Sequence, residues 1–565
     1  MSHQSDIQGG ISPAALDRAG IVSQAARRGG RFATALAAVL AAAGLLVSPD
    51  GAIAQSGGTL RVAMTAADIP TTTGMPNNGF EGMRFLGYPI FEGLTLWDLT
   101  RSDVPAGIRP GLAEKWTQDK ADPIKWIFTL RRGVKFHDGS DFNADAVIWN
   151  LERFYNPQSK QFEAQGGAIS RARNSWLKAW RKIDDFTVEI STNRPVSYFP
   201  YVITYTLIAS PTQFEKTGAS WAEFAKAPAG TGPFKITEVK PRVSVELSRN
   251  TSYWDKNRIP KIDKMVLTPM PEPTTRLAAL RSGQVDWIEV PPPDAIPQLK
   301  GAGFQITMNS YPHNWTHTLR LDKEPWSNKL VRKAANYAVD RVGICKNLLN
   351  DTCVPATGIV YKGHPWFGQP KEIYEYNPNK AKDLLRQAGF DASKHPAKAV
   401  HLISTSGSGQ MLPLAMNELI QKNLKDVGID VDLQPVEWNT LLTRWRAGFK
   451  TPENEGLNAW NISWNFLEPW SGFGRFFHSK SVVPVAVNTM PYINPEADKL
   501  IDEAERTFDI GKQNEILAHV HELVVDDAPW IFVVHDQNPR ALASKVKGFV
   551  QPQSWFVDLT SVTVR

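Results

Sequence analysis

Residues 111–154 read GLAEKWTQDKADPIKWIFTLRRGVKFHDGSDFNADAVIWNLERF. Large apolar side chains alternate in the middle of this stretch, at Trp126, Phe128 and Leu130. A period of two predicts a β-strand, and the Asp138-Gly139 dipeptide predicts a turn after it. Asn143 suits a helix N-cap, and Asp145 places a carboxylate in the first turn, where the helix dipole favours it. The stretch therefore predicts strand, turn and helix in succession.

The segment before this block predicts one more strand and a long connection. Residues 59–64 (TLRVAM) alternate with the same period of two. Residues 65–87 are rich in Thr, Gly, Pro and Asn, a composition typical of loops. We therefore expect a first strand at 59–64 and a loop over 65–87.

The second half of the chain alternates helices and strands. Asn377 as N-cap, Pro378 at the first helical position and Gly389 at the end predict one helix. A second helix ends at Gly428, and residues 429–434 (IDVDLQ) alternate as a strand directly after it. Repeated helix and strand favour α/β construction. The chain has no internal repeat and no long linker, so we expect lobes joined by short hinge strands.

The start of the chain has the pattern of an export signal. Arg27, Arg28 and Arg31 precede an uncharged apolar run over 32–47, and the small-x-small pattern of 52–54 follows. The run is shorter than the roughly 20 residues that span a bilayer. We therefore expect residues 1–54 to be a cleaved signal peptide and the protein to be periplasmic. A retained N-terminal anchor is the alternative, and the export route stays open.

Size and charge bound the mature protein. Without residues 1–54, 511 of the 565 residues remain, which is more than one domain usually holds. The formal net charge of the whole chain is +6, small for this length and spread along it. Nucleic-acid binding requires a basic stripe or a recognisable motif, so we expect no nucleic-acid partner.

The two cysteines, Cys345 and Cys353, are eight positions apart. In an oxidising compartment such a pair favours a small disulfide loop, and two buried thiols are the alternative. Neither residue has the CxxC spacing of a zinc or redox site.

Several motifs together resemble family 5 of the bacterial extracellular solute-binding proteins, the dipeptide, oligopeptide and nickel receptors of ABC importers. Residues 111–154 match the family's Leu-Ala-Glu-x-Trp strand, its Phe-x-Leu-Arg-x-Gly-Val-Lys-Phe-His-Asp-Gly core and its Ala-x-x-Val helix. Further matches follow in family order over most of the chain: 230–234 (GTGPF), 253–254 (YW), 283–287 (GQVDW), 331–334 (VRKA), 379–389 (NKAKDLLRQAG) and 420–429 (IQKNLKDVGI).

The resemblance implies an α/β fold of two lobes with hinge-linked mixed sheets. Lobe I is expected over 55–310 with an extra subdomain inserted within it, lobe II over 311–531, and a return to lobe I over 532–565. Hinge crossings are expected near 307–321 and 531–538. A ligand would lie between the lobes, which would close around it.

Residues 461–473 (NISWNFLEPWSGF) are the segment expected to touch the ligand. In the peptide receptors the equivalent segment carries an Asp that holds the peptide's α-amino group by a charge-assisted hydrogen bond. Aligning Glu468-Pro469 places Asn465 at that position, and Asn carries no charge. The loop before the helix at 416–427 also lacks the Arg that pairs with a dipeptide's carboxylate; Arg444 and Arg446 are candidate substitutes. The expected ligand-binding residues are Asn465, Trp464, Phe466, Thr405, Ser406 and Trp470.

No pattern in the sequence requires catalysis, a metal or a cofactor. His137-Asp138 could be a base with its orienting carboxylate, but it lies in the family's Phe-His-Asp-Gly turn. His313 and His317 have a spacing that binds metal on a helix, but the residues after them predict a strand. We therefore expect no catalytic residues, no metal site and no cofactor.

The resemblance implies a periplasmic receptor that captures a peptide or peptide-like solute and delivers it to an inner-membrane ABC permease and ATPase complex. The protein is expected to be a monomer and not an enzyme. An oligosaccharide, an opine or another polar organic solute is the first alternative, and nickel or a metal chelate the second. A secreted hydrolase and a sensory ligand-presenting protein are alternatives of other classes.

Overall fold

The computed structural model describes residues 57–75, 81–483 and 487–565. The expected signal peptide over 1–54 lies outside these residues. Among the described helices, none combines the length and the apolar composition that crossing a membrane requires. The described residues, from Gly57 onward, belong to one compact unit.

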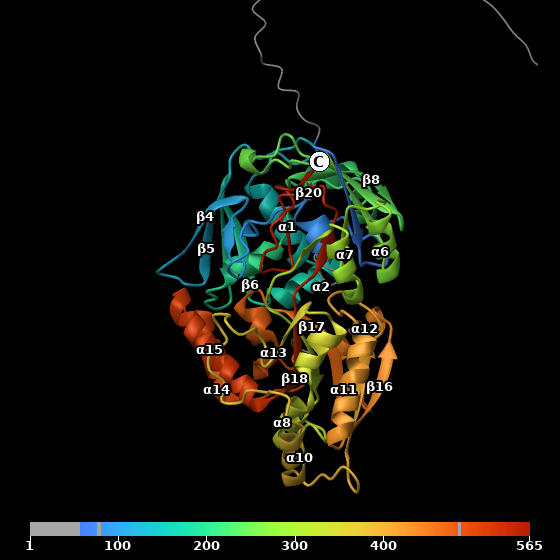
Figure 1. Cartoon of the computed structure of the whole chain (residues 1–565). Helices are drawn as coiled ribbons and strands as arrows, with labels where there is room; N and C mark the ends of the chain where they lie inside the picture. Colours follow the sequence, from blue (N-terminus) through green and yellow to red (C-terminus); the bar gives the residue numbers. More distant parts are fainter. Residues whose placement is uncertain (1–56, 76–80, 484–486) are drawn as a thin grey trace, which may run out of the picture. The chain divides into compact units, whose positions relative to one another are not determined.

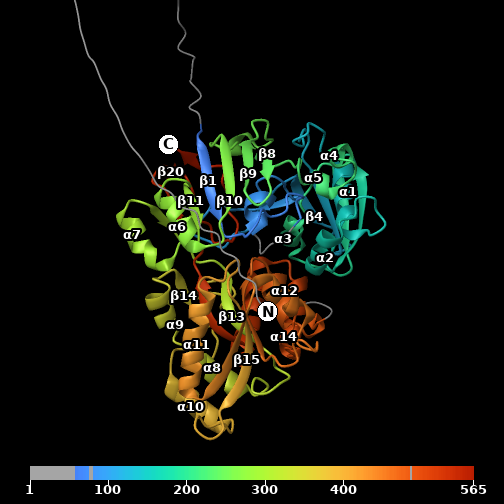
Figure 2. The same ribbon diagram turned by 90° about the vertical axis from the view of Figure 1, so that its right-hand side faces the viewer.

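A seven-stranded mixed sheet carries the first part of the fold (Figures 1 and 2). Its strand order is β12 (Gln305–Thr307), β19 (Arg540–Leu542), β11 (Trp287–Glu289), β1 (Thr59–Met64), β10 (Lys264–Pro269), β9 (Ser244–Arg249) and β8 (Phe234–Lys240). β1 lies parallel to β10 and β11, and the remaining pairs are antiparallel. α6 (Pro273–Arg281) and α7 (Ile296–Gly301) connect strands of this sheet.

Residues 111–154 contribute β4, β5 and α1 to a separate small layer beside that sheet. β4 (Ala113–Gln118), β5 (Lys125–Leu130), β7 (Thr187–Thr192) and β6 (Leu177–Asp184) form a four-stranded antiparallel sheet. α1 (Ala144–Tyr155) and α2 (Ala164–Arg173) pack near it. The alternating apolar residues of β5 point into one core, where Phe128 has no exposed surface. The Asn143 side chain accepts a hydrogen bond from the Ala146 amide, as expected of the N-cap.

A six-stranded sheet carries the other part of the fold. Its strand order is β14 (Cys353–Pro355), β18 (Trp530–Asp536), β13 (His313–Leu319), β17 (Ala459–Asn465), β15 (Ala397–Ser404) and β16 (Ile429–Val436). The main helices around it are α8 (Lys329–Ala338), α10 (Pro378–Gln387), α11 (Pro413–Val427), α12 (Trp438–Ala447), α14 (Pro495–Arg506) and α15 (Ile510–Asp527). The predicted helix boundaries are confirmed, because the Asn377 side chain caps α10 and Gly428 ends α11 with φ of +105°.

The chain passes between the two large sheets twice. Residues 308–312 join β12 to β13, and residues 537–539 join β18 to β19. We call the part built on the seven- and four-stranded sheets lobe I and the part built on the six-stranded sheet lobe II. β18 belongs to the six-stranded sheet up to Asp536, and the second passage follows it directly.

One prediction from the sequence was wrong. Residues 65–87 were expected to be a loop, but 81–87 are helical and end in the π-helical turn η2 (Met83–Gly87). All five residues of η2 are buried. Burial of Met83, Phe85 and Leu86 in the lobe I core stabilises this turn, although the residues around it have a loop-like composition.

Candidate functional site

The carboxyl ends of three strands of lobe II meet where the chain crosses between the lobes. β17 and β18 both run antiparallel to β13, so their last residues lie beside its first residues. β15 is parallel to β17, and its carboxyl end lies on the same side. In α/β sheets, ligands bind outside the carboxyl ends of strands. The residues after β15, β17 and β18 are therefore the candidates for a site.

Asn465 is the last residue of β17 and lies opposite His313. Its Oδ1 and Nδ2 atoms are both buried, and neither has a hydrogen-bond partner among the described residues. A buried amide without partners loses the hydrogen bonds that it makes to water when exposed, at a cost of about 1–3 kcal/mol. Because buried polar groups are normally hydrogen-bonded, a water molecule or a ligand could be the partner of this amide.

The aromatic residues around Asn465 have different environments. Trp464 packs against Trp445, with ring centroids 4.8 Å apart, and its indole nitrogen is buried without a described partner. Phe466 has no exposed surface and packs with Trp530 in the lobe II core. Trp470 extends to the core of lobe I, where its ring centroid is 5.1 Å from that of Trp176.

Glu468 fixes the turn between these aromatic residues. Its carboxylate accepts hydrogen bonds from the amides of Trp470 at 2.7 Å and Ser471 at 3.0 Å, at the start of the π-helical turn η7 (Trp470–Gly474). Burial raises the pKa of the Glu468 carboxyl, and these hydrogen bonds oppose the shift. Glu468 therefore shapes the segment that carries Trp470.

The second half of the loop after β15 lies close to lobe I. Thr405 and Ser406 are exposed. Ser408, Gly409 and Met411 instead line a narrow pocket whose opposite wall comes from lobe I and from the second passage. The other lining residues are Thr65, Arg84, Glu289, Val290, Asp536, Asn538 and Trp555.

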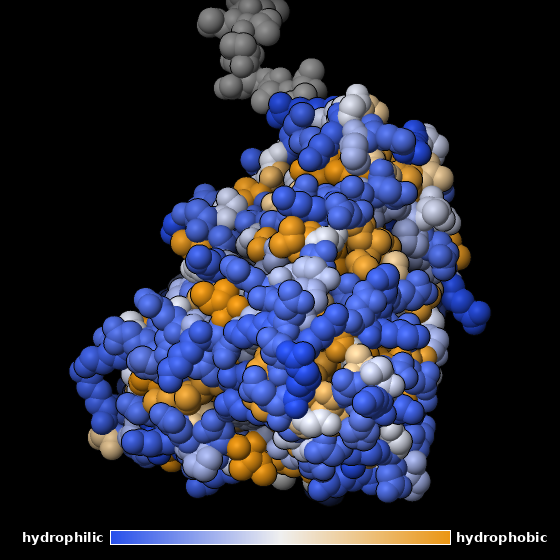
Figure 3. Space-filling view, turned by 60° about the horizontal axis from the view of Figure 1, so that its bottom comes forward, coloured by the Kyte–Doolittle hydropathy of each residue, from blue (hydrophilic) through white to orange (hydrophobic). Residues whose placement is uncertain are grey.

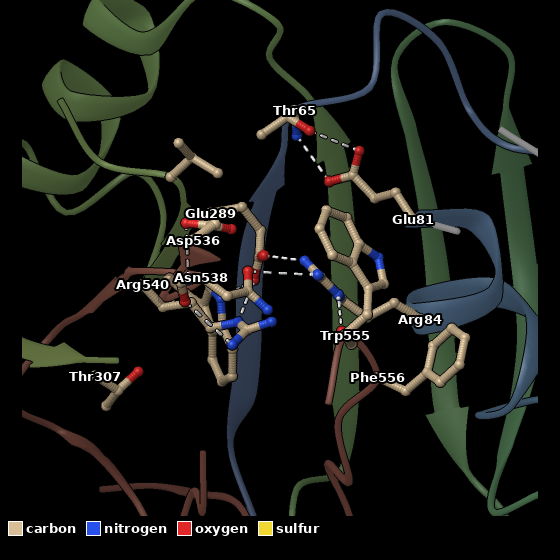
Figure 4. A network of polar contacts seen from close by, with 12 residues as sticks. Thr65, Glu81, Arg84, Glu289, Thr307, Asp536, Asn538, Arg540, Trp555 and Phe556 are labelled. Carbon is tan, nitrogen blue, oxygen red and sulfur yellow. Dashed lines mark hydrogen bonds and ion pairs between the residues drawn. The ribbon is translucent and has the colours of Figure 1, made fainter. Parts of the chain in front are cut away.

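A buried network of charges forms the lobe I side of this pocket (Figure 4). The carboxylate of Glu289 accepts hydrogen bonds from Arg84 and, at 2.8 Å, from Nε of Arg540. Although burial opposes ionisation, the two guanidinium groups keep the pKa of Glu289 below its usual value. Arg84 also donates through Nε to the Trp555 carbonyl at 2.8 Å. Arg540 Nη2, Asn538 Nδ2 and Trp555 Nε1 are buried without described partners.

Asp536 faces the same pocket from the end of β18. It accepts a hydrogen bond from the Tyr311 hydroxyl at 2.8 Å and one from the Asn538 amide at 2.9 Å. Burial nevertheless raises its pKa to about 6, although Arg540 and Arg84 favour the charged form. Sequence reasoning missed this network, because its residues are far apart along the chain and belong to no recognisable motif.

Other contacts join the two lobes near the carboxyl end of α14. The buried carboxylate of Glu505 accepts hydrogen bonds from the guanidinium of Arg194 and from the Tyr198 hydroxyl at 2.8 Å. Gln513 donates to the Ser197 hydroxyl at 2.6 Å. Glu505 and Gln513 belong to lobe II and their three partners to lobe I, so these contacts require the lobes to be together.

The described contacts of His137, of His317 and of the two cysteines are with other parts of the fold. His137 Nε2 lies 2.9 Å from the Gly232 carbonyl, and burial lowers its pKa to about 4. His317 is paired with His401, with the two Nδ1 atoms 3.1 Å apart. The described residues contain no cluster of three metal-ligating side chains. Cys345 and Cys353 are joined in a disulfide, with Cα atoms 5.4 Å apart.

The sequence of residues 107–482 matches the family model of the bacterial extracellular solute-binding proteins, family 5. The chain belongs to this family. Sequence relatives include the glutathione-binding protein GsiB of Salmonella choleraesuis, 26% identical over 463 residues, which cover 79% of this chain and 84% of GsiB. The heme-binding protein A of Haemophilus influenzae is 26% identical over 465 residues, covering 79% of this chain and 82% of that protein.

Solved structures of family 5 receptors have the same fold. The periplasmic binding protein DppA of Helicobacter pylori, in complex with the peptide STSA, superimposes with a TM-score of 0.75 at 22% identity. The alignment covers 91% of this chain and 99% of DppA. A dipeptide-binding protein from Pseudoalteromonas in complex with Met-Leu gives a TM-score of 0.76 at 20% identity, covering 90% and 100%. The two-lobed α/β fold expected from the sequence is therefore confirmed.

Membership of family 5 gives the role of the protein. It is a solute-binding receptor of the kind that serves ABC importers, and not an enzyme. Family 5 receptors are periplasmic and present small-molecule or peptide ligands to a permease.

Proposed function

We propose that this protein is exported by cleavage of residues 1–54 and captures a peptide-like solute between its lobes for an inner-membrane ABC permease and ATPase complex. It would work as a monomer, with the hinge at residues 308–312 and 537–539. The solute would contact both lobes at once and so favour the closed state. The carboxyl ends of β15, β17 and β18 would form the lobe II side of the site.

Asn465 is the observation that carries the choice of ligand. Its amide has no partner among the described residues, so a polar group of the solute can satisfy it. An amide offers a carbonyl oxygen but no negative charge, whereas a hydrogen bond to a charged group contributes roughly 1.5–3 kcal/mol. A free α-ammonium group would lack that contribution here. We therefore favour a peptide-like solute whose amino group is blocked or absent at this position.

An opine or an oligosaccharide is the second candidate, favoured by the aromatic residues beside Asn465. Trp464 is half-buried beside Asn465 and packs on the buried Trp445, and an indole ring is of the kind that binds sugar rings and aliphatic chains. A solute-binding protein of similar fold, MoaA, has been solved with mannopinic acid, with a TM-score of 0.71 at 21% identity.

A thermal-shift screen tests the proposal. The protein over 55–565 would be unfolded and refolded to remove ligand from the host, and then mixed with free peptides, N-acetylated twins, opines and oligosaccharides. A ligand at 100 times its dissociation constant stabilises the native state by about 2.7 kcal/mol. We expect N-acetylated peptides to raise the melting temperature more than free ones. A larger shift with free dipeptides would contradict our interpretation of Asn465, and a shift with sugars alone would establish the second candidate.

A further inference from the structure

The second half of the loop after β15 touches lobe I at Trp555. A Cβ atom placed on Gly409 would lie 3.2 Å from the indole ring of Trp555. It would also lie 2.9 Å from Nε2 of His313 and 3.0 Å from Oγ of Ser463. Gly409 has a φ of +73°, a conformation that glycine adopts without strain. The backbone of lobe II therefore comes as close to Trp555 as a residue without a side chain allows.

These contacts place Trp555 beside the candidate site. His313 and Asn465 are direct partners in β13 and β17, and residues directly opposite each other share one face of a sheet. Ser463 lies on the same face as Asn465, because it is two positions earlier on the strand. The ring centroid of Trp555 is 5.6 Å from that of His313. Trp555 of lobe I thus packs against the face of the lobe II sheet that carries Asn465.

Trp555 leaves little room in the pocket between the lobes. It is buried and lines this pocket together with Ser408, Gly409 and Met411. The cavity that remains has a volume of about 10 Å³, the room of about one water molecule. A solute of more than a few atoms in this place must therefore displace part of the wall.

The charged part of that wall is fixed (Figure 4). The buried carboxylate of Glu289 accepts hydrogen bonds from Arg84 and from Arg540. Asp536 accepts one from the Tyr311 hydroxyl. Moving any of these groups would break hydrogen bonds between buried charges or leave a buried charge without its partner, which is strongly unfavourable.

The indole ring of Trp555 is held less firmly. Its Nε1 atom is buried without a described partner. The guanidinium of Arg84 lies 4.4 Å from the ring centroid, and a contact of this kind is weaker than a buried ion pair. The backbone of Trp555 is fixed separately, because its carbonyl accepts a hydrogen bond from Nε of Arg84 at 2.8 Å. The ring can therefore turn about its side-chain bonds while the backbone stays in place.

We propose that Trp555 sets the upper size of the solute, because its indole ring is the part of the wall that a larger solute has to displace. This inference rests on the proposed function, since it concerns the solute bound at the same interface. A solute small enough to leave the ring in place keeps its contacts with Arg84 and His313. A larger one loses these contacts and binds more weakly, so the selection is a difference between two affinities.

Blocked peptides of increasing length test the inference by titration calorimetry on refolded protein. N-acetyl-Ala-Ala and the N-acetylated tetrapeptide of alanine have the same end groups and differ in size. Sucrose and stachyose form the corresponding pair for the sugar candidate. We expect wild type to bind the smaller member of a pair roughly ten-fold more tightly, and Trp555→Ala to bring this ratio to about one by gaining affinity for the larger member.

Further variants assign the size limit to the indole ring. Trp555→Phe keeps a smaller ring and is expected to give a ratio between those of wild type and Trp555→Ala. Trp116→Ala removes a half-buried indole from β4 in the four-stranded sheet and is expected to leave the ratio unchanged. Circular dichroism and melting curves check that each variant is folded, and Trp555→Phe tests the same ratio if Trp555→Ala does not fold.

The outcomes separate the two proposals. If wild type binds the larger member of a pair as tightly as the smaller one, Trp555 does not limit the size, and the receptor role is unaffected. The same conclusion follows if both Trp555 variants keep the wild-type ratio, or if Trp116→Ala changes it equally. If neither peptides nor sugars bind, the proposed ligand classes fail and the size limit fails with them.

Discussion

At the scale of single residues, position at the lobe junction decides what a side chain can do. Asn465 and Asp536 end β17 and β18, the two strands that flank β13 in the same sheet. The Asn465 amide is buried without a described partner, whereas Asp536 accepts hydrogen bonds from Tyr311 and Asn538. The hydrogen-bonding groups of Asn465 are therefore not used by the described residues, whereas Asp536 is held at the end of β18, directly before the second passage.

Replacing Asn465 by Asp should change the ligand preference. The new carboxylate would offer an α-ammonium group the charge-assisted hydrogen bond that the amide lacks. We expect Asn465→Asp to improve the affinity for free dipeptides by roughly ten-fold or more, relative to their N-acetylated twins. Titration calorimetry with both peptides measures the ratio, and Asn465→Ala is the control that removes the amide without adding charge. An unchanged ratio in Asn465→Asp would place the ammonium group elsewhere.

Replacing Asp536 by Asn should stabilise the protein at neutral pH. A carboxyl whose pKa rises from 3.8 to about 6 on folding binds its proton more tightly in the native state. Its stabilising effect is present below pH 4 and lost as the pH rises through 6, a difference of about 3 kcal/mol. We expect Asp536→Asn to be more stable than wild type at pH 7.5 and similar to it at pH 4.5, as measured by urea unfolding. Lower stability of the variant at pH 7.5 would mean that the ionised carboxylate is required by Arg84 and Arg540.

At the scale of elements, the strand ends and the short connections build the site. β15, β17 and β18 bring three separate stretches of chain to one edge, and the loop after β15 and the turn after β17 extend from it towards lobe I. The disulfide ties the short strand β14 to η6 (Ile344–Leu348), at the outer edge of the same sheet. The edge strand β14 pairs with β18, and the chain continues from β18 into the second passage.

Removing the disulfide should lower stability without altering the fold. Closing a loop of this size restricts the unfolded chain by about 2.5 kcal/mol in the chain-entropy model. We expect the double variant Cys345→Ser/Cys353→Ser to melt roughly 2–5 °C lower than wild type. Scanning calorimetry with and without a reductant measures this, and the reductant should have no effect on the double variant. Equal melting temperatures for wild type and variant would show that the crosslink does not restrict the unfolded state.

At the scale of the whole molecule, closure depends on contacts that cross between the lobes. The visible face of lobe II is mostly hydrophilic, with apolar side chains scattered over it (Figure 3). The Glu505 carboxylate, by contrast, is buried against Arg194 and Tyr198 of lobe I. Opening the hinge would break these contacts and expose Glu505, so they contribute to closure.

Weakening this contact should shift the receptor towards the open state. Glu505→Gln removes the charge that Arg194 and Tyr198 bind, and apparent affinity falls with the fraction of closed molecules. We expect a few-fold loss of affinity for whichever ligand the screen identifies and a larger radius of gyration by X-ray scattering. Glu503→Gln, on the same helix and without a described salt bridge, is the control. An unchanged affinity in Glu505→Gln would show that the contact forms equally in the open protein.

Acid should unfold the protein steeply, because several buried histidines are held neutral. Burial lowers the pKa of His137, His521 and His535 to about 4, and that of His313, His317 and His364 to about 3. A lowered pKa favours the neutral form in the native state, so stability is lost as the pH falls below 6.5. At pH 5.5 each residue costs about 1.4 kcal/mol relative to pH 7.5, together on the order of 8 kcal/mol. Urea unfolding at both pH values measures the loss, and equal stabilities would contradict the neutral state of these residues.

The sequence by itself determined the family, the α/β class and the helix and strand positions in the blocks around 111–154 and 377–434. Those features depend on local signals, namely periodicity, caps such as Asn143 and Asn377, and glycines such as Gly428. It also singled out Asn465 through a departure from the family's pattern. Tertiary structure alone brought Arg84, Glu289 and Arg540 together and placed Glu505 against Arg194. These residues are hundreds of positions apart, and burial and strand pairing, which no local pattern records, decide which of them meet.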